Sequence, residues 1–403
     1  MQRNISHKQK LLVKLTKLFG TPLYVYDKYI ISDNYKKMDH SIQYPHKQIH
    51  YACMANGNIE ILRVIRKLGI SIHVSSPGEL LLAMEAGFKN NEIVFTGSNL
   101  TCDELGFIAK KKVLINLDSL SQVQKYGNLM PGSEIGIRIN PDIRIPQNNT
   151  INWTIGSNSR LGINKENLRN VKKIVSKYHL KIVGLQMYIG SNILNYRWFV
   201  SCIDFLLNVG KDFEHLKYID IGGGFGIPYK NSEKPFDWQK FGDQITKRMN
   251  NFSVMMGKRI LLKLEPGRSI IGSAGILLTK VVDVKFSNNK VFIGTDTSFS
   301  NFARPYIYDS YHEIIPLTVH GKQALFPHVY VCGNTVASRD FIGKDRKMRM
   351  VKEGDILVIM NTGAYGYSMS SQFCGRVRPA EVLLDGDRHI VIRKREVLED
   401  LLH

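Results

Sequence analysis

Residues 218–226 read YIDIGGGFG, and residues 260–268 read ILLKLEPGR. In each stretch a short apolar run, typical of a buried strand, leads directly into a turn that contains glycine. Glycine lets backbone N–H groups approach an anion closely, and in a (β/α)8 barrel phosphate often lies at the loops after strands seven and eight. The two stretches therefore predict the last two strands of such a barrel, followed by anion-binding loops.

Outward from these strands, the chain alternates short apolar runs with segments of helical periodicity. Eight runs have the length and composition of buried strands: 49–53, 71–74, 92–96, 113–116, 134–139, 182–187, 218–221 and 260–264. Helix-length segments with apolar residues at helical spacing separate them, as at 58–68 and 198–213. This order predicts the α/β class and a (β/α)8 TIM barrel.

The pattern changes after residue 280, where short β-branched runs alternate with turns. These runs lie at 281–285, 291–295, 328–331, 355–360, 380–385 and 389–393. We expect a C-terminal all-β domain, and the strand-like segment at 21–26 could join it. The predicted domains are an N-terminal segment at 1–29 that joins the β domain, a barrel at 30–280 and the β domain at 281–403.

The composition excludes several classes of protein. The chain has 403 residues, 43% of them hydrophobic, with 33 glycines and 13 prolines, so it is neither collagen-like nor largely disordered. No run of 18 apolar residues occurs and the N-terminal residues include scattered lysines, so we expect neither a membrane span nor a secretory signal. Five scattered cysteines without CxxC spacing indicate reduced thiols, and we expect a cytoplasmic protein.

The formal charge of +20 raises the question of a nucleic-acid partner. The densest basic clusters, at 110–112 and 344–347, are short, and the chain lacks recognition motifs and interleaved aromatic and basic residues. We predict no nucleic-acid partner. His46 and His50 are four residues apart but have no third ligand nearby in the sequence, so we expect surface or capping histidines and no metal site.

Motifs along nearly the whole chain resemble, in order, those of the fold-type III pyridoxal-phosphate decarboxylases, the family of diaminopimelate and ornithine decarboxylases. They are TPLYVY at 21–26, YACMAN at 51–56, SSPGEL at 75–80, RINP at 138–141, IGS at 189–191, GGGFG at 222–226, EPGR at 265–268, RPYIY at 304–308, GAY at 363–365 and RPAEV at 378–382. The resemblance implies an alanine-racemase-like barrel with a β domain. It also implies pyridoxal 5′-phosphate as cofactor, an amino-acid substrate, and a homodimer whose sites are shared between subunits.

The resemblance also identifies a missing catalytic group. Members of the family hold the cofactor as a Schiff base with a lysine on the first barrel strand, and this chain has Met54 at that position. A thioether cannot form an imine. We expect Met54 to fill an apolar pocket.

Three further motifs depart from the family pattern. The family's second-domain motif carries a proton-donor cysteine and a substrate-binding glutamate, which are Val336 and Ala337 here. A pattern with a histidine that stacks on the cofactor ring reads GLQMYIGS at 184–191, and a Ser-x-Tyr-Asn motif reads SQFC at 371–374. Four departures at functional positions favour a lineage that has left the parent reaction.

Other functional positions of the family are retained. The resemblance assigns cofactor binding to a set of residues in the loops and the β domain: Tyr188, Ser191, Gly223, Gly224, Glu265, Gly267, Arg268 and Tyr365. It assigns the distal carboxylate of the substrate to Arg268, Arg304, Tyr308 and Tyr365. An arginine fork suits a carboxylate because it pairs with both oxygens.

The leading hypothesis is a diverged diaminopimelate-decarboxylase-like protein that binds an anionic cofactor and a carboxylate-bearing amino acid without lysine aldimine chemistry. The cofactor would then be pyridoxal phosphate held non-covalently. Three alternatives stay open. The pocket could hold another planar cofactor such as haem, with Cys332, Cys374, Tyr188 or one of several histidines as an axial ligand. The chain could be an inactive subunit that forms a heterodimer with an active decarboxylase, or an inactivated Lys-to-Met variant of one.

Overall fold

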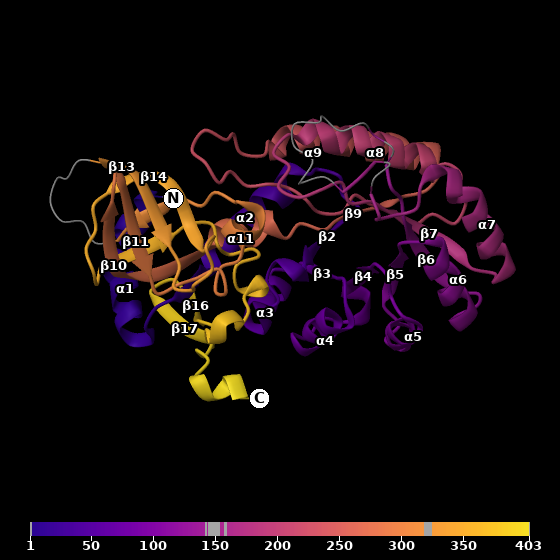
Figure 1. Cartoon of the computed structure of the whole chain (residues 1–403). Helices are drawn as coiled ribbons and strands as arrows, with labels where there is room; N and C mark the ends of the chain where they lie inside the picture. The colour runs from indigo at the N-terminus through magenta and orange to yellow at the C-terminus, as the bar shows by residue number, and fades with distance from the viewer. Residues whose placement is uncertain (1, 142, 144–153, 157–158, 318–324, 403) are drawn as a thin grey trace. The chain divides into compact units, whose positions relative to one another are not determined.

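The computed structural model of the chain describes residues 2–141, 143, 154–156, 159–317 and 325–402 (Figure 1). It forms two compact units. The barrel unit comprises Ser32–Pro228 and Lys234–Ile270, and the β unit comprises Met1–Ile31, Tyr229–Glu233 and Ile271–His403.

The barrel unit confirms the predicted TIM barrel. Eight parallel strands close in chain order: β2 (Lys47–Ala52), β3 (Ser71–Val74), β4 (Ile93–Gly97), β5 (Leu114–Leu117), β6 (Glu134–Arg138), β7 (Lys181–Gln186), β8 (Tyr218–Asp220) and β9 (Leu261–Leu264). All eight coincide with predicted runs to within two residues at either end. Their apolar residues fill the barrel because parallel strands are covered on both faces.

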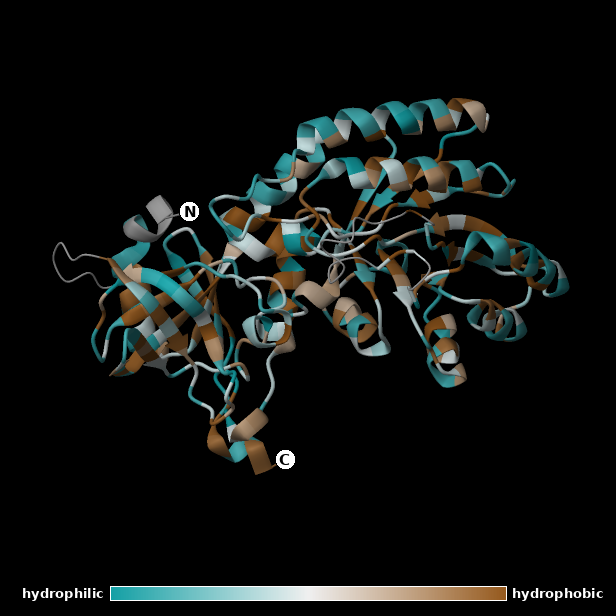
Figure 2. Ribbon diagram, turned by 45° about the horizontal axis from the view of Figure 1, so that its top comes forward, coloured by the Kyte–Doolittle hydropathy of each residue, from teal (hydrophilic) through white to brown (hydrophobic). Residues whose placement is uncertain are grey.

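Helix α2 (Lys28–Ser41) precedes β2. The other helices follow barrel strands: α3 (Ile59–Lys67), α4 (Pro77–Glu85), α5 (Cys102–Lys110), α6 (Leu120–Leu129), α7 (Leu168–Lys177), α8 (Tyr196–Gly210) and α9 (Trp238–Met255). Several begin at a side chain that accepts a hydrogen bond from a backbone N–H of the first turn, as Ser76 does for α4 and Thr101 for α5. Figure 2 shows hydrophilic and hydrophobic stretches alternating along these helices, as expected of amphipathic helices that cover a core.

The β unit contains a nine-stranded sheet. The main strand order is β14-β13-β11-β10-β1-β16-β17, and β15 pairs with both β10 and β12. The bounds are β1 (Leu23–Asp27), β10 (Gly275–Ser287), β11 (Lys290–Thr295), β12 (Ile314–Pro316), β13 (Leu325–Cys332), β14 (Phe341–Arg349), β15 (Ile356–Ile359), β16 (Ala380–Asp385) and β17 (Arg388–Arg393). Strand β1 pairs antiparallel with β10 and parallel with β16, so the N-terminal strand belongs to this sheet.

Helix α1 (Gln2–Phe19) packs on this sheet. Its Leu12 and Leu15 are buried in a core with Leu23, Leu278 and Val358. Two shorter helices, α10 (Arg268–Ile271) and α11 (Arg304–Tyr308), carry residues singled out by the sequence. Among the described residues, no helix combines the length and the apolar character that crossing a bilayer requires.

Candidate functional site

The carboxyl ends of the barrel strands carry a group of buried polar and charged side chains, which we call the barrel cluster. Its members come from β3, β6, β7, β8 and β9 or from the residue that follows: His73, Arg138, Gln186, Asp220, Lys263 and Glu265. All six are less than one-tenth exposed. The strands are parallel, so their carboxyl ends meet at one mouth of the barrel, where active sites of this fold lie.

Glu265 connects two other members of the cluster. Gln186 donates from Nε2 to Glu265 Oε2 at 2.9 Å, and His73 Nε2 lies 3.7 Å from Glu265 Oε1. Burial raises the pKa of Glu265 to about 7, and the hydrogen bond from Gln186 opposes that rise. Near neutral pH this carboxyl group therefore exchanges a proton readily.

Asp220 and Lys263 provide opposite charges beside Glu265. Burial, followed by the charge of Glu265, raises the pKa of Asp220, while the N–H of Gly222 donates to its Oδ1 at 2.9 Å. Lys263 Nζ lies 4.5 Å from the centre of the Tyr218 ring, and burial lowers its pKa. The lysine partly offsets the negative charge that two neighbouring carboxyl groups bring into the barrel.

Arg138 pairs with Asp118, which follows β5. Arg138 Nη1 lies 3.4 Å from Asp118 Oδ1, and its guanidinium group lies 5.7 Å from the centre of the Tyr188 ring. Asp118 also accepts hydrogen bonds from Ser98 Oγ at 2.6 Å and from the N–H of Gly162 at 3.0 Å. This carboxylate therefore fixes the arginine and two loops at the barrel mouth.

Several buried atoms of the barrel cluster form no hydrogen bond within the described part of the chain, among them His73 Nδ1, Arg138 Nη2 and Gln186 Oε1. Buried polar groups in folded proteins are nearly always paired, so a network with only a structural role would be expected to satisfy them. The cluster thus retains donors and an acceptor for a polar ligand.

The glycine-rich loop after β8 packs against the loops of both neighbouring strands. A Cβ on Gly223 would lie 2.3 Å from the carbonyl oxygen of Glu265, and one on Gly224 would lie 2.1 Å from that of Gly190. Phe225 anchors the loop because its ring stacks on Phe199 at 4.3 Å inside an aromatic core. The three loops therefore approach backbone to backbone, which only glycine permits.

Arg268 completes this side of the mouth. It donates from Nη2 to Ser191 Oγ at 2.9 Å, and a Cβ on the preceding Gly267 would lie 2.9 Å from the Cβ of Ala55. The structure thus places seven of the predicted cofactor residues in the segments directly after β7, β8 and β9, with Arg268 as the first residue of α10: Tyr188, Ser191, Gly223, Gly224, Glu265, Gly267 and Arg268.

Met54 lies in a single 3-10 turn, Cys53–Ala55, directly after β2. Its side chain is 49% exposed in the chain. The expectation that Met54 fills an apolar pocket is therefore wrong. The strand ends in a short turn that turns this residue out of the packed interior, while its neighbours Cys53 and Ala55 are buried.

The remaining predicted residues belong to the β unit. Arg304 begins α11 and is 5% exposed; its Nε donates to His312 Nε2 at 3.1 Å and its guanidinium lies 5.0 Å from the centre of the Tyr229 ring. Tyr308 ends the same helix and is half exposed. Tyr365 has a φ of +58°, a conformation that costs free energy for a bulky residue and is often retained at functional sites.

Val336 lies in the loop between β13 and β14, and its side chain is 99% exposed. The loop, residues 333–340, takes its shape from Asp340, which is 4% exposed. Its carboxylate accepts hydrogen bonds from the N–H of Phe299 at 2.9 Å and from the N–H and hydroxyl of Thr335 at 3.0 and 2.6 Å. The loop is thus held in place without any contribution from the side chain of Val336.

The surroundings of the two cysteines considered as haem ligands do not favour iron binding. Burial raises the pKa of the Cys332 thiol to about 11, which disfavours a thiolate ligand, and Cys374 is exposed. Within the described ranges, no group of three histidines, cysteines, aspartates or glutamates could hold a metal ion.

The sequence reasoning missed several members of the barrel cluster: His73, Asp220 and Lys263. It also placed His50 on the surface or at a cap, whereas His50 is 1% exposed inside β2, so that expectation is wrong. These residues could have been recognised in the sequence as single polar residues inside short apolar strands, as in SIHV, YID and LLKL. Such a residue can only be accommodated in a barrel if its partners lie on neighbouring strands.

Comparison with known proteins places this site in context. A family model described as "Pyridoxal-dependent decarboxylase, pyridoxal binding domain" matches residues 30–272. The diaminopimelate decarboxylase of Methanothermobacter thermautotrophicus is 37% identical, over 97% of this chain and 92% of the relative. That of Aquifex aeolicus is 33% identical, over 96% of this chain and 91% of the relative.

Solved structures agree in fold and coverage. A crystal structure of diaminopimelate decarboxylase matches with a TM-score of 0.91 and 29% identity, covering 98% of this chain and 96% of its own. The diaminopimelate decarboxylase of Helicobacter pylori, solved in complex with L-lysine, matches with a TM-score of 0.88 and 28% identity. The match covers 97% of this chain and 98% of that enzyme's chain. These matches give no support to the haem alternative.

Proposed function

Because this chain belongs to the fold-type III pyridoxal-phosphate decarboxylase family, we propose that it binds pyridoxal phosphate without a covalent bond to Met54, together with an amino acid that carries a distal carboxylate. One observation carries the proposal: the buried cluster around Glu265 keeps unsatisfied polar atoms for a ligand, while the position of the lysine holds a thioether. The protein is similar to diaminopimelate decarboxylases over nearly its whole length.

The residues of the barrel mouth fit this cofactor. Pyridoxal phosphate, when bound, supplies an aldehyde and a ring that accepts electrons from the substrate. Glu265 would meet the ring nitrogen, and its raised pKa lets it share a proton there near neutral pH. The loop at Gly223 and Gly224 would hold the phosphate, since its backbone can approach an anion without Cβ atoms in the way.

The residues of the β unit would serve the substrate. Arg304 is buried, with Nε bonded to His312, a geometry suited to holding a guanidinium group in one orientation for a carboxylate. Tyr308, four residues further along α11, is exposed enough to contact a ligand. The H. pylori relative solved with L-lysine supports an amino acid as the ligand class.

Three replaced side chains limit the reaction. Met54 offers no amine with which an incoming amino acid could exchange, and Val336 offers no proton at the position of the family's donor. Ala337 removes a carboxylate that the resemblance assigns to the substrate. We infer that this chain does not perform the lysine-linked decarboxylation of its relatives.

Titration of the purified protein with pyridoxal phosphate, followed by absorbance, tests the proposal. We expect saturable binding to the wild type and at least about tenfold weaker binding to Glu265→Gln, since a buried charged hydrogen bond is lost. Glu134→Gln, which changes an exposed glutamate paired with Lys217, is the matched control and should bind like the wild type. No saturable binding to the wild type would refute the proposal.

Activity assays with diaminopimelate test the limit on the reaction. We expect no lysine formation by the wild type or by Met54→Lys alone, because Val336 and Ala337 are still in place. The triple variant Met54→Lys, Val336→Cys, Ala337→Glu should gain activity relative to both. Lysine formation by Met54→Lys alone, at the level of the triple variant, would contradict the role given to Val336 and Ala337.

The same preparations address the subunit arrangement. We infer a homodimer with shared sites, supported by membership of this family. Light scattering should give the mass of two chains for the protein purified alone. A chain that is monomeric alone, and dimeric only when an active decarboxylase subunit is added, would favour the heterodimer.

A further inference from the structure

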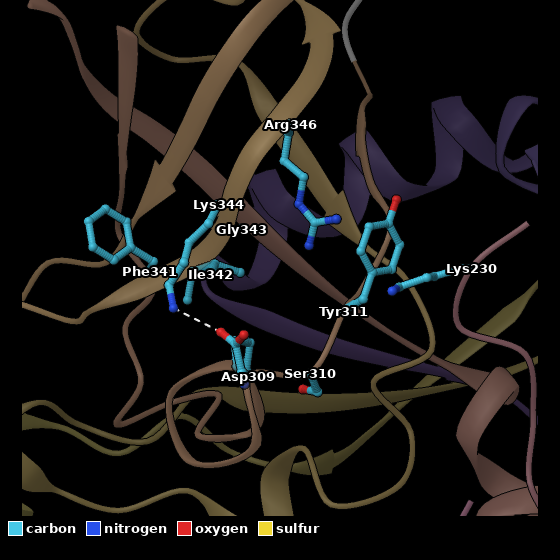
Figure 3. Close-up of a pocket in the computed structure, with 10 residues that line it drawn as sticks. Lys230, Asp309, Ser310, Tyr311, Phe341, Ile342, Gly343, Lys344 and Arg346 are labelled. Carbon is cyan, nitrogen blue, oxygen red and sulfur yellow. Dashed lines mark hydrogen bonds and ion pairs between the residues drawn. The ribbon is translucent and has the colours of Figure 1, made fainter. Parts of the chain in front are cut away.

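A second polar pocket lies entirely within the β unit, between α11, β14 and the loop that contains Lys230 (Figure 3). Its volume is about 210 Å³, and its walls include Pro305, Phe341 and Ile342. Pockets that hold drug-sized ligands enclose about 300–1,000 Å³, so this one suits a small molecule.

Three cationic side chains reach this pocket. Arg346 lies over the ring of Tyr311 with 3.7 Å between its guanidinium carbon and the ring centre, and Lys230 Nζ lies 5.7 Å from the same ring centre. Lys344 Nζ pairs with Asp309 Oδ1 at 2.8 Å. Figure 3 shows the guanidinium group of Arg346 and the ammonium group of Lys230 on either side of the Tyr311 ring.

The pocket holds more positive charge than its own residues neutralise. Asp309 is the single acidic residue among those that line it, and it is paired with Lys344. Neither Arg346 nor Lys230 forms an ion pair with a carboxylate among the described residues. Asp345, the neighbour of Lys344 in sequence, contacts His328 instead, with 2.8 Å between Oδ1 and Nδ1.

Two buried polar atoms at the pocket also form no hydrogen bond with described residues: Arg346 Nε and Ser310 Oγ. Gly343 makes room for the arginine, because a Cβ there would lie 2.9 Å from Arg346 Nε. Burial lowers the pKa of Arg346, because the charged guanidinium group loses hydration there. A bound anion would offset this loss by pairing with the charge.

We propose that this pocket binds a small oxyanion with two negative charges, such as inorganic phosphate or a short dicarboxylate. Three cations and one carboxylate leave two positive charges to be matched. The guanidinium fork of Arg346 would pair with two oxygens, Lys230 would add a point charge, and Ser310 would donate its hydroxyl. The site differs in position from the phosphate loops of the barrel, since all its residues belong to the β unit.

Calorimetric titration of the full-length protein with inorganic phosphate, and separately with succinate, tests this site. We expect Arg346→Gln to weaken the binding component that belongs to the pocket at least about tenfold. Lys230→Ala should weaken it by up to about fivefold, because that side chain is exposed. Lys290→Ala is the matched control, since Lys290 is also exposed and lies 5.4 Å from a tyrosine ring centre.

Phosphate bound by the glycine loop of the barrel would be unaffected by all three substitutions, so the component lost in Arg346→Gln identifies the pocket. Binding of either anion that is lost in Arg346→Gln and retained in Lys290→Ala supports the site. Equal binding to these two variants, or no binding to the wild type, overturns it. Thermal denaturation shows whether each variant is folded. If Arg346→Gln is unstable, the weaker binding expected of Lys230→Ala tests the site in its place.

Discussion

The barrel cluster and the loop at 333–340 are held in place in very different ways. In the cluster, Glu265 and Asp220 are buried and tied to neighbouring strands by hydrogen bonds. In the loop, Val336 is almost fully exposed, and hydrogen bonds to Asp340 and from Asn334 hold the backbone in place. Met54 resembles Val336 in this respect, because it is half exposed.

The difference shows which functional groups a protein can lose easily. Replacing a buried charged residue leaves its partner unpaired, which costs about 3–5 kcal/mol, whereas exposed substitutions usually change stability by less than about 0.5 kcal/mol. Met54 and Val336, the positions that the resemblance assigns to the family's amine and proton donor, are exposed positions of the second kind. Glu265, which the resemblance assigns to the cofactor ring, is a buried position of the first kind.

The largest effect that we expect comes from Asp118→Ala. The substitution leaves the buried guanidinium group of Arg138 without its carboxylate, so the free energy of unfolding should fall by about 3–5 kcal/mol. Urea denaturation measures this. Ser98→Ala, which removes only one hydroxyl donor to Asp118, should cost about 1 kcal/mol. Equal losses in the two variants would show that the ion pair is not what stabilises the mouth.

Glu265→Gln should change how stability depends on pH. In the folded protein the pKa of Glu265 is about 7, whereas a glutamate in the unfolded chain ionises near 4.5, so the free energy of unfolding falls as pH rises from 4.5 to 7. The variant lacks this term and should gain up to about 3 kcal/mol over the wild type between pH 4.5 and 7. Parallel stability profiles for the two proteins would contradict the assigned proton.

Asp340→Ala should have a smaller effect, confined to the β unit. The carboxylate accepts three hydrogen bonds that hold the loop at 333–340, and hydrogen bonds to a charged group contribute about 1.5–3 kcal/mol. Thermal denaturation should show a loss in that range. Asp385→Ala, at an exposed ion pair with Lys28, is the control and should be nearly neutral.

Val336→Ala should have almost no effect on stability. Its side chain contacts solvent on nearly all sides, so we expect a change of less than about 0.5 kcal/mol. Urea denaturation beside Asp340→Ala gives the comparison. A loss above about 1 kcal/mol would mean that this residue is buried against another chain, and that its replacement was constrained by packing.

Much of the barrel could be predicted from the sequence because its strands are short, apolar and separated by amphipathic helices. Strand β14 was missed because Phe341–Arg349 is rich in charged residues and lies at an edge of its sheet, where no alternating pattern is needed. Helix α1 was missed because lysines interrupt its apolar positions. Leu12 and Leu15 nevertheless lie at helical spacing and are buried on the sheet.

The candidate site was predicted in part. The glycine-rich loop and the turn at 265–268 stood out because such sequences serve close backbone approach, and the structure brings them together. His73 and Lys263 were missed because each is a single polar residue whose partners come from other strands. Pairing across a barrel depends on register and closure, which a local pattern does not contain.

In the function proposed above, pyridoxal phosphate is held without a bond to a lysine. Borohydride reduction of the protein saturated with one equivalent of pyridoxal phosphate, followed by intact-mass spectrometry and peptide mapping, tests it most directly. We predict an unchanged mass for the wild type and the mass of one reduced cofactor on residue 54 for Met54→Lys. Stoichiometric labelling of the wild type at a barrel lysine, with Lys263 the first to inspect, would contradict the claim.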